Sequence, residues 1–139
     1  MSTPSDKVRA LSRLVGRWQV SGGSTGTVTY EWAAGGFFLL QHVELAQDDE
    51  PVTGLEVIGH LHPFGGERSE NVHSRYYGSG GGTFDYVYEM EGDTLTIWAG
   101  DKGSPAYFRG TFNDDDSEMV GAWVYPGGGG YDSTMTRLP

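Results

Sequence analysis

The stretch Leu14 to Val20, LVGRWQV, decides the fold when it is read together with Met135-Thr136-Arg137 at the other end of the chain. Gly16 permits a close turn and Trp18 supplies a large flat ring, an arrangement that can plug the base of a meandering β-barrel. In a barrel that closes, the first and last strands are neighbours, so the guanidinium of Arg137 can lie over the Trp18 indole. Such a pair contributes about 0.5 to 2 kcal/mol. We therefore expect the two ends of the chain to meet as adjacent strands.

The pairing of Gly16-x-Trp18 with an arginine on the final strand resembles the lipocalins and the wider calycin superfamily of barrels. Two further runs, EWAAGGFFL at Glu31 to Leu39 and GLEVIG at Gly54 to Gly59, resemble an uncharacterised bacterial group of small lipocalin-like proteins. The resemblance spans nearly the whole chain. It implies one lipocalin-like β-barrel domain over residues 1–139.

The composition limits the classes of function. The chain has no cysteine, which excludes disulfides and thiolate chemistry and fits a reducing cytoplasm. No apolar stretch approaches the roughly 20 residues of a membrane span, and the N-terminal MSTPSDKVRA lacks the apolar core of a signal peptide. A formal net charge of -10 opposes binding to nucleic acid or to an anionic membrane. We expect a soluble cytoplasmic protein with neither partner, whose acidity serves solubility or, alternatively, recruits a cationic partner.

Short apolar runs between turn residues predict an all-β chain after one helix. The helix start Thr3-Pro4-Ser5-Asp6 and the shared face of Val8, Leu11 and Leu14 predict a helix over Pro4 to Leu14. It would lie across one mouth of the barrel as a lid or, alternatively, as a gate. The expected strands cover residues 16–22, 26–33, 37–46, 52–62, 69–77, 83–90, 94–99, 105–112, 119–125 and 131–137. Because the loops between them are short, the sequence predicts an up-and-down antiparallel β-barrel of about ten strands.

Period-two alternation gives each strand an apolar face, which must point into the barrel. A packed core would favour Leu, Ile and Val, yet this face is rich in tyrosine and tryptophan. Buried tyrosine hydroxyls need partners, so we expect a cavity that holds a ligand; the alternative is a filled barrel with hydroxyls at its rim. The residues expected to bind the ligand are Tyr30, Trp32, Gln41, Ser74, Tyr76, Tyr86, Tyr88, Trp123 and Tyr125.

The histidines are expected on the opposite, outer face. Haem or a catalytic zinc needs ligands inside a closed site, and some calycin-type barrels bind haem through an inward histidine. Here His42, His60, His62 and His73 all point outward under the predicted registers, so we expect no haem, no metal and no other cofactor. Strand 52–62 is the sensitive one, because a shift of one residue would turn Glu56, His60 and His73 inward.

The interior pattern predicts binding of a small hydrophobic or aromatic molecule. Its rings would stack on Trp32, Tyr76, Tyr86, Tyr88 and Trp123, while Gln41 and Ser74 would fix polar groups. The alternative is a cofactor-free cyclase or isomerase of a polyketide-like substrate, in which a tyrosine polarises a carbonyl or transfers a proton. That alternative lacks an inward base under the predicted registers. A purely structural interaction module would instead have a filled barrel.

One apolar patch is expected on the outside of the barrel. The predicted registers place Phe38, Leu40, Ile58 and Tyr77 on the solvent side of three adjacent strands. A contiguous patch of this kind indicates a partner surface. We expect a homodimer that packs these strands together.

Overall fold

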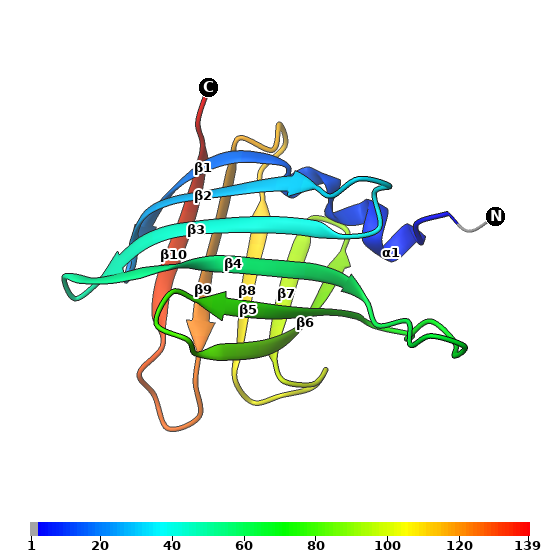
Figure 1. The fold of residues 1–139 in the computed structure, drawn as a ribbon. Coiled ribbons are helices and arrows are strands. Elements are labelled where there is room, and N and C mark those ends of the chain that lie inside the picture. The colour runs from blue at the N-terminus through cyan, green and yellow to red at the C-terminus, as the bar shows by residue number, and fades with distance from the viewer. Residues whose placement is uncertain (1–2) are drawn as a thin grey trace.

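The computed structural model describes residues 3–139 and shows an all-β barrel with a short helical segment at its N-terminal end (Figure 1). The segment comprises helix α1, Asp6–Arg9, and the 3-10 turn η1, Ala10–Leu14. The strands are β1 Gly16–Gly22, β2 Thr25–Trp32, β3 Leu39–Gln47, β4 Glu50–His60, β5 Val72–Gly78, β6 Thr83–Glu91, β7 Thr94–Ala99, β8 Tyr107–Phe112, β9 Glu118–Val124 and β10 Tyr131–Arg137. Each pairs antiparallel with its sequence neighbours and β1 pairs with β10, so the barrel is closed. The predicted fold class is confirmed.

Closure of the barrel sets Trp18 on β1 opposite Arg137 on β10. The guanidinium carbon of Arg137 lies 4.1 Å from the centre of the Trp18 ring, which is fully buried. The same guanidinium donates hydrogen bonds to the carbonyl oxygens of Val15 at 2.7 Å, Arg13 at 2.8 Å and Asp116 at 2.9 Å. The predicted stacking is confirmed, and these hydrogen bonds hold the cation over the ring.

The helical segment closes the end of the barrel where Trp18 lies. Val8, Leu11 and Leu14 are buried in the barrel core, and Trp18 donates from Nε1 to the carbonyl oxygen of Leu14 at 2.8 Å. Ser5 caps α1, because its Oγ accepts a hydrogen bond from the backbone N–H of Val8 at 3.1 Å. The segment begins at Asp6 instead of Pro4, and its second half is a 3-10 turn instead of an α-helix.

The sequence prediction assigns the wrong face of β4 to the interior, because its register is wrong by one residue. The turn between β3 and β4 contains only Asp48 and Asp49, which have positive φ angles of 51° and 65°. Two left-handed residues are the requirement of a tight two-residue hairpin, and aspartate tolerates that conformation better than most side chains. The predicted register requires a turn that is one residue longer. The shorter turn pairs Gln41 with Glu56, so Glu56 points into the barrel.

Two further residues change face with β4, and His73 does not. Ile58 is fully buried inside the barrel instead of lying on the outer patch. His60 also turns to the inner side, at the end of the strand where it meets the helical segment. His73 stays outward because β5 has the predicted faces, with Val72 and Ser74 buried on either side of it.

The remaining registers keep every predicted face. The pairs Tyr76 with Phe84 and Phe108 with Trp123 are as predicted. The β2–β3, β6–β7 and β9–β10 hairpins are each shifted by two residues from the prediction. A shift of two returns each side chain to its own face, since strand side chains alternate with a period of two.

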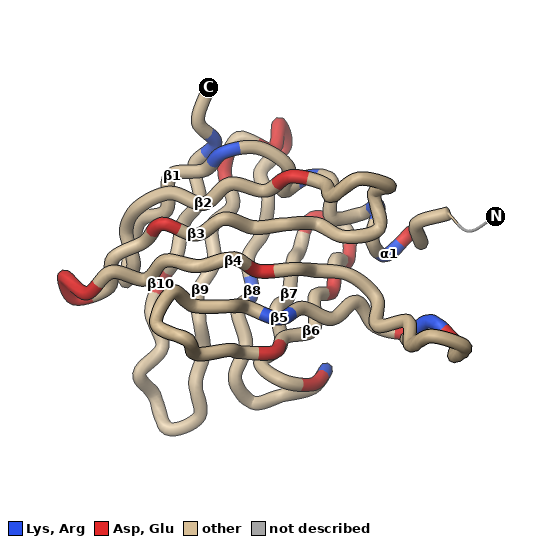
Figure 2. Tube along the Cα trace, viewed as in Figure 1, with Lys and Arg blue, Asp and Glu red and all other residues tan. Residues whose placement is uncertain are grey.

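Two turns of the barrel carry clusters of acidic residues (Figure 2). Acidic groups occupy the β3–β4 turn, at Asp48 and Asp49, and the β8–β9 turn, at Asp114 to Asp116. Of the part of the chain that the structure describes, no helix is long and apolar enough to span a membrane.

Candidate ligand-binding site

A cavity of about 240 Å³ lies inside the barrel. It reaches Ser24 beside the β1–β2 turn, Gln47 and Val52 beside the β3–β4 turn, Phe84 on β6 and Tyr131 on β10. These positions surround the end of the barrel opposite α1 (Figure 1), and the Phe84 side chain is 59% exposed. The cavity therefore has its mouth at this end and its closed base toward Trp18.

Aromatic rings form a large part of its wall. The ring centres of Tyr86 and Trp123 are 6.0 Å apart, and those of Phe108 and Trp123 are 5.5 Å apart, with tilted planes in both pairs. Near the mouth, Tyr76 and Phe84 stack at 6.4 Å. The aromatic lining residues are Tyr30, Tyr76, Phe84, Tyr86, Tyr88, Phe108, Trp123 and Tyr131.

Six of the nine residues predicted to bind a ligand line this cavity, namely Tyr30, Gln41, Tyr76, Tyr86, Tyr88 and Trp123. Trp32 instead packs against the core cluster. Ser74 is buried but does not line the cavity. Tyr125 lies outside it, stacked on Trp123 with ring centres 6.2 Å apart and planes 11° apart.

Glu56 is the cavity residue that the sequence prediction missed. Its side chain is only 5% exposed, and it sits opposite Gln41 on β3 and Tyr76 on β5. Among residues 3–139, neither Oε2 of Glu56 nor Oγ of Ser74 has a hydrogen-bonding partner. Gln41 is already engaged, since its Nε2 donates to the Tyr30 hydroxyl at 2.9 Å. The turn residues Asp48 and Asp49 are the sequence signal that could have located Glu56.

Burial dominates the electrostatics of the cavity. It raises the pKa of Glu56, and the nearby hydroxyls of Ser74 and Tyr88 offset only part of that rise. Burial, followed by the charge of Glu56, also raises the pKa values of Tyr30 and Tyr88. The phenols therefore stay protonated and can donate hydrogen bonds. Among the described residues that line the cavity, Glu56 is the one acid, and none is a lysine, arginine or histidine. The Glu56 carboxyl therefore has no basic partner in the cavity wall.

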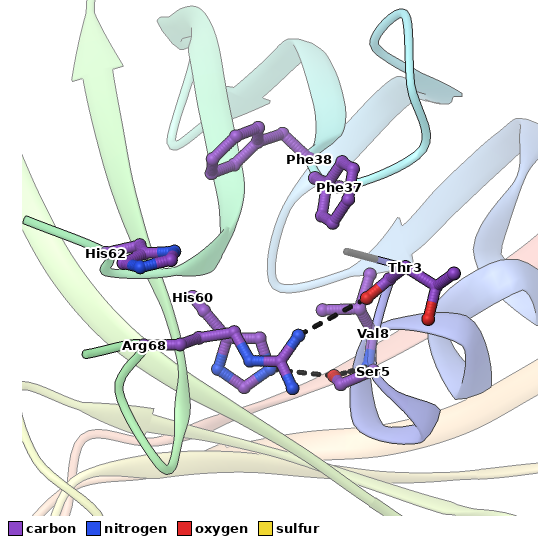
Figure 3. A pocket seen from close by; sticks show the side chains of 8 residues that line it. All are labelled: Thr3, Ser5, Val8, Phe37, Phe38, His60, His62 and Arg68. Carbon is purple, nitrogen blue, oxygen red and sulfur yellow. Dashed lines mark hydrogen bonds between the residues drawn. The ribbon is translucent and has the colours of Figure 1, made fainter. Parts of the chain in front are cut away.

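A second hollow lies outside the barrel, between α1 and the loop after β4 (Figure 3). There Ser5 Oγ lies 2.7 Å from His60 Nε2, and His60 Nδ1 lies 3.1 Å from the carbonyl oxygen of Asn71. A serine nucleophile would need a base oriented by a carboxylate. None of the residues lining this hollow is acidic, and the Ser5 hydroxyl is engaged as the cap of α1. We interpret the pair as a tie between the helix and β4.

Within residues 3–139, no cluster of three or more histidine, aspartate and glutamate side chains is arranged to hold a metal ion. Comparison with models of known protein families and with curated protein sequences gave no match to this chain. The closed ten-stranded antiparallel barrel is consistent with a lipocalin-like fold.

Proposed function

We propose that this protein is a lipocalin-like binding protein that holds a small hydrophobic or aromatic molecule in the barrel cavity. The observation that carries the proposal is a cavity walled by aromatic rings in which one buried carboxyl has an unfilled hydrogen-bonding position. Few buried polar groups in proteins lack a partner, and a bound ligand would supply one. The cavity is smaller than the roughly 300 to 1,000 Å³ of drug-sized sites, so the ligand is small.

The proposal is tested with prodan, a small neutral dye whose emission shifts to the blue in an apolar site. We expect saturable binding at micromolar concentration. Trp123→Ala and Tyr86→Ala should each weaken it by up to about tenfold, since one aromatic pair contributes roughly 0.5 to 1.5 kcal/mol beyond its buried area.

His60→Ala is the matched control, because His60 lies at the closed end near α1 and does not line the cavity. Its affinity for the dye should equal that of the wild type. Equal losses in all three variants would place the dye outside the barrel, and no saturable binding would reject the proposal.

The inward position of Glu56 also supports a second candidate, a cofactor-free cyclase or isomerase of a polyketide-like substrate. A buried carboxyl with a raised pKa can take a proton from carbon and return it at another position. Glu56 would have to perform both steps, since no histidine or second carboxyl of the described residues lines the cavity. Exchange of solvent deuterium into acetylacetone, lost in Glu56→Gln, would separate this activity from simple binding.

A further inference from the structure

The charge balance of the cavity carries an inference about its ligand. We infer that the bound molecule is a small amine with an aromatic or alkyl body, whose ammonium group pairs with Glu56. This inference rests on the proposed binding function and narrows it to one chemical class.

The first support is the inventory of charged groups. Glu56 lines the cavity without any lysine, arginine or histidine beside it among the described residues. A buried carboxylate is costly unless it is paired. A ligand carboxylate or phosphate would find no basic group to pair with in this enclosed volume, so the cavity disfavours anions. A cation is the ligand with which an ionised Glu56 can pair.

The second support is the unfilled hydrogen-bonding capacity around Glu56. Its Oε2 is buried without a partner within residues 3–139. An ammonium group carries several N–H donors and no acceptor, as the lysine side chain does. It can therefore donate to the free carboxylate oxygen and to the hydroxyl of a lining tyrosine at once. A neutral alcohol offers one donor and satisfies fewer of these positions.

The third support is the aromatic wall. Cations are attracted to the faces of tryptophan and tyrosine within about 6 Å of the ring centre. Tyr76 sits opposite Glu56 on the neighbouring strand, while Tyr86 and Trp123 contact each other and both line the cavity. A carboxylate with surrounding rings is the arrangement that retains an organic ammonium ion out of water. The same rings accommodate the apolar body of the amine.

The negative charge of the protein surface also favours a cationic ligand. The chain has a net charge of -10, and Asp48, Asp49 and Glu50 follow the mouth residue Gln47 directly. A negative potential at the entrance raises the local concentration of cations and speeds their association.

Binding of an ammonium ion should also release a proton. Burial raises the pKa of the Glu56 carboxyl, which favours the neutral form of that group in the empty cavity. The titratable groups that feel its charge are the phenols of Tyr30, Tyr76, Tyr86 and Tyr88, and each has a raised pKa. Pairing with the cation makes Glu56 ionise, and its proton passes to the buffer. No such release accompanies a neutral ligand.

The test uses three probes that share one ring: phenethylamine, phenethyl alcohol and phenylacetate. Their binding to the full chain is measured by calorimetry at pH 7.5 in two buffers of different ionisation enthalpy. We expect phenethylamine to bind at least about tenfold more tightly than the alcohol, phenylacetate not to bind, and close to one proton to be released with the amine alone.

Two variants assign the effect to Glu56. Glu56→Gln should remove both the preference for the amine and the proton release, while binding of the alcohol is retained. Glu44→Gln removes the same charge from the exposed outer face of β3 and should leave all three affinities unchanged. If Glu56→Gln does not fold, the proton release of the wild type decides alone.

The outcomes separate this inference from the function on which it rests. Alcohol binding equal to amine binding, an amine preference that survives in Glu56→Gln, or amine binding without proton release overturns the inference and leaves the binding function intact. Failure of all three probes together with prodan rejects both.

Discussion

Arg137 joins three parts of the chain through one guanidinium. It covers the Trp18 ring and donates to carbonyl oxygens before β1, at Arg13 and Val15, and in the β8–β9 turn, at Asp116. Gly16 makes this possible, because its φ of 127° is unfavourable for other residues and a Cβ there would lie 2.7 Å from Nη1 of Arg137. The Gly-x-Trp motif is therefore part of the structural closure of the barrel.

We predict that Trp18 and Arg137 are energetically coupled. Trp18→Ala should reduce the free energy of unfolding by about 3 to 5 kcal/mol, the range for a large buried aromatic side chain. Arg137→Ala should cost less, about 2 to 3 kcal/mol, because it leaves carbonyl groups unpaired. Urea denaturation of both single variants and the double variant should give a coupling of about 0.5 to 2 kcal/mol.

The control for this cycle is Arg75→Ala. Arg75 pairs with Asp85 on the outer surface, where both side chains are more than half exposed, and exposed pairs contribute at most about 1 kcal/mol. Strict additivity of the Trp18 and Arg137 substitutions would contradict the stacking interaction.

Among the elements, the β3–β4 hairpin shows what the sequence could predict and what it could not. Turn residues and alternation were sufficient for ten strands and for the faces of most strands, and the pairing of Trp18 with Arg137 was sufficient for closure. They were insufficient for β4, because its face depends on whether the turn around Asp48 and Asp49 has two residues or three. Six of the predicted site residues reach the cavity because errors of two residues preserve the face; Glu56 was missed because an error of one residue reverses it.

The helical segment depends on a polar contact that should respond to pH. Asn71 offers only a carbonyl oxygen to His60 Nδ1, so Nδ1 carries the proton and Nε2 of the neutral ring accepts from the Ser5 hydroxyl. Burial, with the positive charges of Arg68 and Lys7, lowers the pKa of His60. The folded protein therefore binds fewer protons at this site than the unfolded chain.

We expect the contribution of His60 to stability to be present above its unfolded pKa of about 6.5 and to be lost as the pH falls below it. Urea denaturation at pH 7.5 and pH 5.5 should show a larger loss for the wild type than for His60→Gln. His62→Gln, in the exposed loop after β4, should behave like the wild type. A wild-type loss no larger than that of His60→Gln would contradict the contact.

Ser5→Ala removes both the cap of α1 and the partner of His60. It should lower the free energy of unfolding by about 1 kcal/mol at pH 7.5, the usual cost of losing an N-cap.

At the scale of the whole molecule, closure leaves no free sheet edge among residues 3–139, since β1 pairs with β10. Association must then use the faces of strands or their turns. On the outside, Phe38 is 42% exposed and Tyr77 47% exposed, with Leu40 partly covered near them on β3. Val57 takes the outward position that the sequence predicts for Ile58. This surface still supports the proposal of a homodimer that packs β3 to β5.

The homodimer is tested by sedimentation velocity at pH 7.5. The wild type should sediment as a dimer and Leu40→Glu as a monomer. Val120→Glu is the matched control, because Val120 is 54% exposed on β9, on the far side of the strand order from β4. A wild-type monomer at every accessible concentration rejects the interface, and a dimer that survives Leu40→Glu places the contact elsewhere.

The tight turn at Asp48 and Asp49 has a consequence for how such a barrel can diversify. The number of residues in a hairpin turn decides which side chains of the following strand point into the barrel. One residue inserted into this turn would therefore exchange the inner and outer side chains of all of β4. The interior would lose its acid and gain the neutral side chains of Leu55 and Val57, with no substitution inside the barrel. A change in the length of this loop can therefore change which ligand the cavity prefers, and it does so at a surface position where insertions are ordinarily tolerated.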